Sequence, residues 1–168
     1  YMALDSSENL YVTDFGNARV SVFDKDGNPL FNFGKKTGSF PGFIAPTGIC
    51  IFSDMVYVAD AVKGAIYSFD RSGNYTGMLV PEKTFNRPES LRLSDDHIVV
   101  SDGTRICSVD LSTGAVFENG RTGSAPSRII CAQPDVNGNI LATDFVSNEV
   151  YVLSKMTELV GGLFVQIE

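Results

Sequence analysis

Short apolar runs that alternate with turn residues dominate this chain. In residues 1–40 such runs occur at 2–4, 10–12, 20–23 and 29–33. Asp, Ser, Asn and Gly stand between the runs, and these residues favour tight turns. The segments between the runs show no helical pattern. The sequence therefore predicts four short strands that pair as an antiparallel sheet.

The same unit recurs along the chain with a regular period. A strand that ends in aspartate returns four times, with the final residues Asp14, Asp60, Asp102 and Asp144. Subtraction of these residue numbers gives spacings of 46, 42 and 42. A period of about 40–45 residues built from short strands is typical of propeller blades. The sequence therefore predicts an all-β propeller of four four-stranded antiparallel blades.

The period divides the chain into blades and a tail. We place the blades at about residues 1–40, 41–82, 83–121 and 122–158, and a closing or exit strand at 159–168. A proline opens the apolar run ahead of the last three blades, and these prolines are Pro46, Pro88 and Pro126.

Two segments resemble the repeat of a known family. Residues 10–27 read Leu-Tyr-Val-Thr-Asp-Phe-Gly-Asn-Ala-Arg-Val-Ser-Val-Phe-Asp-Lys-Asp-Gly and closely resemble the NHL repeat, as does the linker at 38–49. The resemblance implies a β-propeller of NHL type that acts mostly as an interaction platform. It also implies five or six blades, and the chain starts in mid-strand at Tyr1. We therefore expect this chain to be part of a larger propeller.

Composition excludes two classes of partner. The chain has 13 Lys and Arg residues against 20 Asp and Glu residues, which gives a net charge of −7. Nucleic-acid binding depends on clustered basic residues, so we expect no nucleic-acid partner. No apolar stretch reaches the roughly 18–20 residues that a membrane-spanning helix needs, so we expect no membrane insertion.

Residues that could carry chemistry are few. Cys50, Cys107 and Cys131 each lie in an apolar run and no two have CxxC spacing, so we expect buried packing rather than a disulfide or metal site. His97 is the single histidine, which excludes a zinc site built on several histidines. No nucleophile elbow or phosphate loop occurs, and the innermost strands offer almost no Glu or Asn. We expect no catalytic residue, no metal and no cofactor.

The recurring aspartates lie at the ends of the second strands and therefore at one rim. One interpretation is a carboxylate ring that binds a cation. The other is that Asp14, Asp60, Asp102 and Asp144 are structural turn caps, each of which accepts hydrogen bonds from N–H groups of the following turn. Recurrence in every blade favours capping, and carboxylates on different blades are too far apart to form one cation cage.

Aromatic and basic residues are the candidates for binding. Phe15 and Phe145 follow rim aspartates in turns that should face solvent, where they could anchor a partner or pack onto neighbouring loops. Arg92 and Arg128 interrupt the first strands of two blades, where they could contact an anionic or carbonyl ligand in the channel or remain solvated. The expected contact rim consists of Phe15, Lys35, Lys36, Arg121 and Phe145.

These observations and the resemblance predict a non-enzymatic module that binds a protein or peptide through its rim loops. One alternative is a metal-dependent hydrolase or lyase whose channel site is completed by further blades. Another is a propeller that binds a small ligand or glycan through Arg92 and Arg128. Exposed apolar faces at open blade ends could also pair two copies of the chain. The family favours a periplasmic or extracellular location, whereas unpaired cysteines fit a reducing compartment equally well.

Overall fold

The computed structural model describes residues 1–122 and 127–154, and within these ranges every regular element except one short 3-10 helix is a strand. Blade 1 contains β1 (Met2–Leu4), β2 (Leu10–Asp14), η1 (Phe15–Asn17), β3 (Arg19–Phe23) and β4 (Pro29–Phe33). Blade 2 contains β5 (Pro46–Phe52), β6 (Met55–Asp60), β7 (Ala65–Asp70) and β8 (Tyr75–Val80). Blade 3 contains β9 (Pro88–Ser94), β10 (His97–Asp102), β11 (Arg105–Asp110) and β12 (Val116–Arg121). Blade 4 contains β13 (Ile129–Pro134), β14 (Ile140–Asp144) and β15 (Glu149–Leu153).

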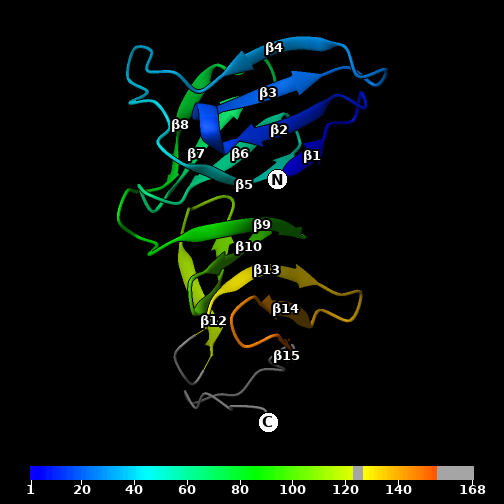
Figure 1. The fold of residues 1–168 in the computed structure, drawn as a ribbon, viewed down its shortest axis with the longest axis vertical. Helices are drawn as coiled ribbons and strands as arrows, with labels where there is room; N and C mark the ends of the chain where they lie inside the picture. Colours follow the sequence, from blue (N-terminus) through cyan, green and yellow to red (C-terminus); the bar gives the residue numbers. More distant parts are fainter. Residues whose placement is uncertain (123–126, 155–168) are drawn as a thin grey trace.

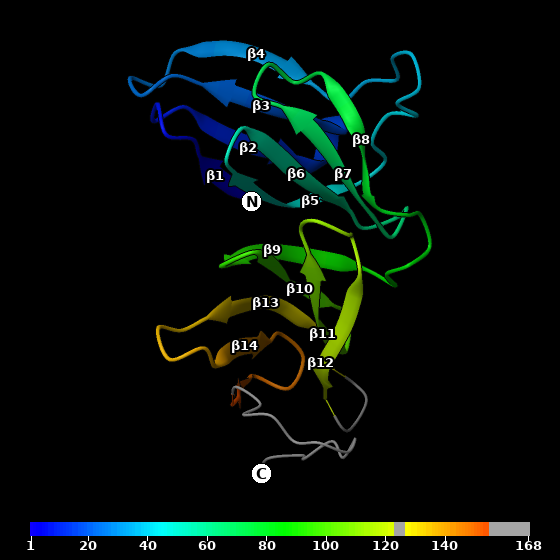
Figure 2. The ribbon, with the colours of Figure 1, turned by 180° about the vertical axis from the view of Figure 1, so that it is seen from behind.

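Each blade is a sheet of consecutive antiparallel strands, and the blades stack in chain order as in a propeller. Blades 1 to 3 have four strands each, and blade 4 has three within the described residues. Blades 1 and 2 occupy one half of the molecule and blades 3 and 4 the other (Figures 1 and 2). The innermost strands β5, β9 and β13 contact one another in series. The prediction of an all-β propeller is confirmed, while the strand expected at 159–168 lies outside the described residues.

Apolar side chains between neighbouring blades form the core. Between blades 1 and 2 the ring of Phe40, which belongs to the linker, lies at the centre of an aromatic cluster. Its centroid is 5.0 Å from that of Phe43, 5.3 Å from that of Tyr67 and 5.1 Å from that of Phe69. Two further clusters fill the seams between blades 2 and 3 and between blades 3 and 4. Burial of apolar surface at about 25 cal/mol per Å² makes these three seams the main source of stability.

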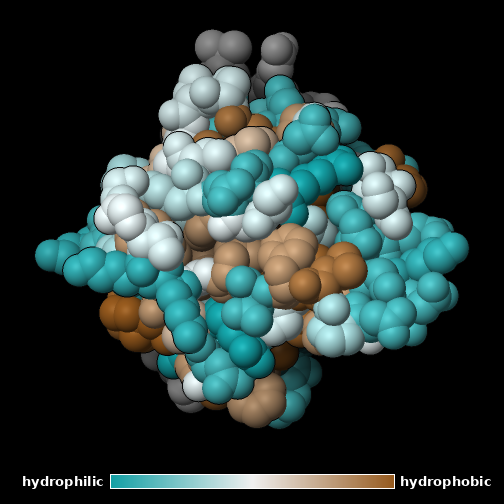
Figure 3. All heavy atoms as spheres, turned by 90° about the horizontal axis from the view of Figure 1, so that it is seen from above, coloured by the Kyte–Doolittle hydropathy of each residue, from teal (hydrophilic) through white to brown (hydrophobic). Residues whose placement is uncertain are grey.

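The outer face of blade 1 has no neighbour within the described residues. Met2 is 64% exposed, although Ile49, Leu91 and Ala132 at the same register position of the other blades are at most 1% exposed. Figure 3 views the molecule from the side on which β4 lies in Figure 1, and it shows apolar surface between hydrophilic areas. Met2, whose counterparts line the seams between the other blades, therefore faces solvent here.

Blade 4 has a similarly open face. Val150 is 67% exposed, whereas Ile66 and Ile106 at the same register position of blades 2 and 3 are buried. The described part of the chain thus presents two unpartnered apolar sheet faces, one on its first blade and one on its last.

The start of blade 4 differs from the proline pattern. Pro46 pairs with Asp60 and Pro88 pairs with Asp102, but the partner of Asp144 is Ile129. Pro126, which lies outside the described residues, comes three positions earlier in the sequence and is not the counterpart of the other two prolines. The sequence alignment of this strand was therefore wrong by three residues. No helix in the described ranges has the length and apolar character needed to cross a membrane.

Candidate functional site

The strand-end aspartates position the residues at the mouth of the channel. Asp60 is fully buried, and its Oδ2 accepts hydrogen bonds from the backbone N–H groups of Ile44 at 2.7 Å and Ala45 at 3.2 Å. Its Oδ1 accepts two more from the turn after β6, from Val62 and Lys63, both at 3.0 Å. One carboxylate therefore joins the end of β6 to the segment that leads into β5, the innermost strand of the same blade.

In blades 3 and 4 the strand-end aspartate likewise accepts a hydrogen bond from the segment that leads into the innermost strand. In both blades the donor is the backbone of an arginine. Asp102 accepts a hydrogen bond from the backbone N–H of Arg87 at 2.6 Å, and Asp144 accepts one from that of Arg128 at 3.0 Å. Each arginine directly precedes the innermost strand of its blade. Because both backbones are anchored in the same way, the two side chains begin at equivalent places around the channel.

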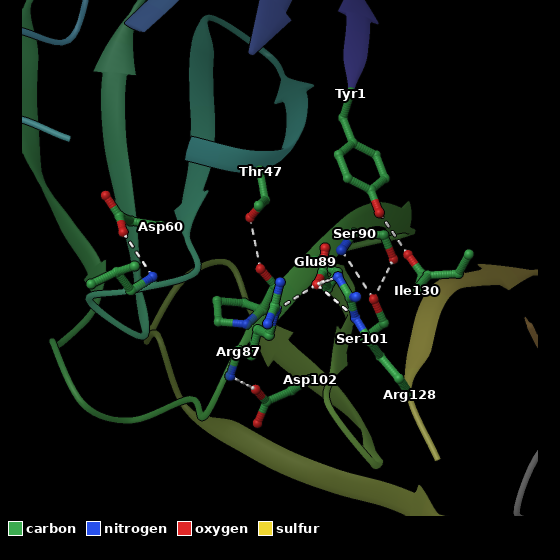
Figure 4. Close-up of polar contacts among 12 residues, drawn as sticks. Tyr1, Thr47, Asp60, Arg87, Glu89, Ser90, Ser101, Asp102, Arg128 and Ile130 are labelled. Carbon is green, nitrogen blue, oxygen red and sulfur yellow. Dashed lines mark hydrogen bonds and ion pairs between the residues drawn. The ribbon is translucent and has the colours of Figure 1, made fainter. Parts of the chain in front are cut away.

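Glu89 brings the two arginines together. It is 7% exposed, and its Oε1 accepts a hydrogen bond from Arg87 Nε at 2.8 Å. The same oxygen accepts hydrogen bonds from Arg128 Nε at 3.2 Å and from Arg128 Nη2. Figure 4 shows the three side chains converging, Glu89 from β9 and the two arginines from the segments before β9 and β13. A carboxylate that bridges two guanidinium groups holds both in defined orientations, since each hydrogen bond is charge-assisted.

Hydrogen bonds between innermost strands surround this cluster. Thr47 Oγ1 donates to the backbone carbonyl of Pro88 at 2.7 Å, which links blade 2 to blade 3. Tyr1 Oη donates to the backbone carbonyl of Ile130 at 2.7 Å and so links blade 1 to blade 4 across the channel (Figure 4). Polar side chains on all four innermost strands or their leading segments therefore meet at one end of the channel.

A hollow of about 340 Å³ opens over this cluster. All four blades contribute residues to it, and they are Tyr1, Thr13, Phe15, Pro46, Thr47, Ala61, Arg87, Glu89 and Arg128. We call this set the channel mouth. It combines two arginines and one carboxylate with two aromatic rings and several hydroxyl groups, as binding pockets typically combine apolar walls with a few placed polar groups.

Three of the candidates from the sequence lie at or beside the channel mouth. Phe15, in η1, is 59% exposed and lines the hollow together with Arg128. Phe145 is 66% exposed, and its backbone N–H donates to the carbonyl of Arg128 at 3.0 Å, so it adjoins the mouth without lining it. Both aromatic rings face solvent, as the turn positions predict.

The other candidates do not line the hollow. Lys35 and Lys36 are exposed in the segment after β4. Arg121, at the end of β12, forms a two-point ion pair with Glu118 at 2.6 and 2.9 Å. Arg92 is half-buried on β9, and its Nη1 donates to the backbone carbonyl of Leu91 at 3.0 Å. Of the five residues of the predicted contact rim, only Phe15 therefore lines the hollow.

Sequence reasoning missed Arg87 and Glu89. The innermost strands offer almost no Glu or Asn, and their one glutamate in the described residues, Glu89 at the second position of β9, was not singled out. A signal was available, because Arg87 and Glu89 flank Pro88, the proline that opens β9. Its meaning could not be read from the sequence alone, since the second ion-pair partner, Arg128, is 39 residues away.

Asp144 and two of the thiols, Cys50 and Cys107, have shifted pKa values. Burial raises the pKa of Asp144, but hydrogen bonds from Ser127 and from backbone N–H groups outweigh burial and lower it to about 2. Burial raises the pKa of Cys50 to about 12 and that of Cys107 to about 11, so neither thiol is a nucleophile at neutral pH. In residues 1–122 and 127–154, no three His, Cys, Asp or Glu side chains are grouped as a metal site would require.

Comparisons with known proteins show the fold but not the family. No family model matches the chain, and no curated protein does. Solved structures do: a nidogen/laminin complex superposes with a TM-score of 0.70 at 19% identity over 90% of this chain and 57% of that one. Virginiamycin B lyase from Staphylococcus aureus superposes with a TM-score of 0.70 at 12% identity, over 91% of this chain and 54% of the lyase chain. The chain thus spans little more than half the length of these two neighbours.

A third neighbour is close to this chain in length. The computationally designed Ika4 protein superposes with a TM-score of 0.64 at 15% identity, over 90% of this chain and 87% of that one. At these identities the likeness concerns the fold alone. The resemblance to the NHL repeat therefore stays a prediction, whereas the propeller fold is established.

Proposed function

We propose that this chain is a non-enzymatic propeller module that binds a segment of a protein or peptide over its channel mouth. The observation that carries the proposal is the hollow of about 340 Å³, to which all four blades contribute. Its position at the converging ends of the innermost strands is where a rigid ring of blades offers a concave surface. The exposed rings of Phe15 and Phe145 beside it are the kind of aromatic anchors that dominate protein interfaces.

The chemistry of the mouth favours binding over catalysis. Its one carboxylate, Glu89, is engaged by two arginines and is almost buried. A general acid or base must present a proton-donating or proton-accepting atom to a substrate, and the burial of Glu89 together with its two arginine partners opposes that role. One structural neighbour is a lyase and another belongs to a nidogen/laminin complex, and at their low identities they support neither role over the other.

A random peptide library displayed on phage tests the proposal. We expect selection against the immobilised chain to enrich peptides whose binding is lost in Phe15→Ala and retained in Phe117→Ala. Phe117 is a matched control, because it is a 57% exposed phenylalanine on β12 that does not line the hollow. Synthetic copies of the enriched peptides should shift the amide resonances of Thr13, Phe15 and Ala61 in NMR titrations. Enrichment of no peptide, or of peptides that perturb only other surfaces, would contradict the proposal.

A further inference from the structure

We infer that the channel mouth recognises a carboxylate group of the bound segment, through Arg87 and Arg128 together. This inference rests on the proposed function, which says only that a peptide segment binds there. It adds the chemical class of that segment, namely an acidic peptide.

The first observation is that both arginines keep hydrogen-bond donors that Glu89 does not use. Glu89 accepts from Nε of Arg87 and from Nε and Nη2 of Arg128. Within the described residues, the two Nη atoms of Arg87 donate no hydrogen bond. The same holds for the Nη1 atom of Arg128. A guanidinium group carries five N–H donors, so donors remain available on both side chains.

The second observation is the difference in exposure within the cluster. The side chain of Arg87 is 54% exposed and that of Arg128 is 36% exposed, whereas that of Glu89 is 9% exposed. The carboxylate thus lies beneath the two guanidinium groups, which face the hollow. The three side chains carry two positive charges and one negative charge, on a molecule whose net charge is −7.

The third observation is preorganisation. Asp102 and Asp144 fix the backbones of Arg87 and Arg128, and Glu89 fixes their Nε atoms. A free arginine loses side-chain entropy when it binds a carboxylate, but these two have already lost most of it on folding. Planar guanidinium groups held in place suit the two oxygens of a carboxylate, which they can bind bidentately.

The surroundings favour an acidic residue in a peptide over an extended polyanion. The exposed ring of Phe15 borders the hollow and offers apolar contact to a neighbouring side chain of the ligand. A long polyanion would extend over the acidic body of the protein and be repelled by it. A single carboxylate interacts mainly with the charges nearest to it, because charges beyond roughly 8–10 Å are screened at physiological ionic strength.

Short synthetic peptides test the inference on the wild-type chain. The probe is acetyl-Gly-Phe-Glu-Gly-amide, titrated into ¹⁵N-labelled protein at 50 mM NaCl and followed by NMR at the side-chain Nε–H groups of Arg87 and Arg128. We expect it to bind at least about tenfold more tightly than the same peptide with Gln in place of Glu, and to weaken at 500 mM NaCl. Acetyl-Gly-Phe-Gln-Gly with a free carboxyl terminus shows whether a terminal carboxylate serves as well as a side-chain one.

Two variants connect the binding to the arginines. Arg87→Gln should weaken binding of the Glu peptide about tenfold, whereas Arg121→Gln, which changes an exposed arginine outside the mouth, should leave it unchanged. Equal binding of the Glu and Gln peptides at the mouth would overturn the inference but leave the proposed function standing. If the library selection also yields no peptide at the mouth, the proposed function itself fails. The comparison between peptides uses wild-type protein, so it stays decisive even if Arg87→Gln does not fold.

Discussion

The strand-end aspartates show how one residue type can have different importance in equivalent places. Asp60 is fully buried and accepts hydrogen bonds from four backbone N–H groups. Asp14 is partly exposed and accepts from the backbone and side chain of Asn17 and from Arg19. Removal of Asp60 would leave buried donors without partners, whereas water can replace Asp14.

We predict that Asp60→Ala destabilises the chain much more than Asp14→Ala. A buried donor without an acceptor costs about 1–3 kcal/mol, so loss of at least about 3 kcal/mol is expected for Asp60→Ala. For Asp14→Ala the expected loss is about 1 kcal/mol or less, as for an exposed cap. Urea unfolding followed by circular dichroism measures both values. Similar losses in the two variants would contradict the view that these carboxylates differ in role.

Stability should also depend on the charge of Asp144. Its pKa is about 2 in the folded chain against an ordinary value of 3.8, so the unfolded chain binds the proton more readily. The stabilisation is therefore fully present above about pH 4 and is lost as the pH falls to about 2. We predict that the difference in unfolding free energy between wild type and Asp144→Asn shrinks over that range. A difference that is constant between pH 6 and pH 2 would exclude this linkage.

At the scale of elements, close approach between innermost strands requires glycine at one position. A Cβ atom on Gly48 of β5 would lie 2.6 Å from the backbone nitrogen of Leu91 on β9. Both atoms belong to strands that pack against each other in the core, so neither can move independently. Gly77 of β8 has room, since the nearest atom to its Cβ would be Ser68 Oγ at 3.7 Å.

We predict that Gly48→Ala destabilises the chain by about 2 kcal/mol or more, within the range found for overpacked cores. Gly77→Ala should be neutral or stabilise by up to about 1 kcal/mol, because alanine has less conformational freedom to lose on folding. Thermal unfolding of the two variants compares them directly. A tolerated alanine at position 48 would mean that β5 and β9 can separate without cost.

The sequence predicted the strands well and the site poorly, for physical reasons. Alternation and turn residues act over a few positions, so strands such as Leu10–Asp14 could be located from local pattern alone. The cluster at Glu89 depends on contacts between residues 39 positions apart, and no local pattern records such a contact. At blade 4 the proline pattern was misleading, because Pro126 comes three positions before Ile129, where β13 begins.

At the scale of the whole molecule, the two open apolar faces have a consequence for solution behaviour. Each internal seam joins the later face of one blade to the earlier face of the next. Within residues 1–122 and 127–154, the face with Met2 and the face with Val150 are the same two kinds of surface without partners. Two copies that join these faces would bury surface of the kind that is already buried at three seams.

We predict that the chain self-associates as its concentration rises, and that Val150→Lys weakens this association. Val136→Lys is the control, because Val136 is fully exposed in a turn and belongs to neither open face. Light scattering over a range of concentrations measures the mass of each variant. A wild-type chain that stays monomeric throughout would contradict the prediction.

In blades 2 to 4 a carboxylate joins the end of the second strand to the start of the first, and this has a consequence for how such a molecule can evolve. The residue it holds is Ala45 in blade 2, Arg87 in blade 3 and Arg128 in blade 4. Blades 2, 3 and 4 thus each hold one residue at the mouth through their own aspartate. A duplicated blade would already contain the aspartate that holds this residue at the mouth. One substitution there, such as alanine to arginine, could then change what the mouth recognises while the scaffold stays the same.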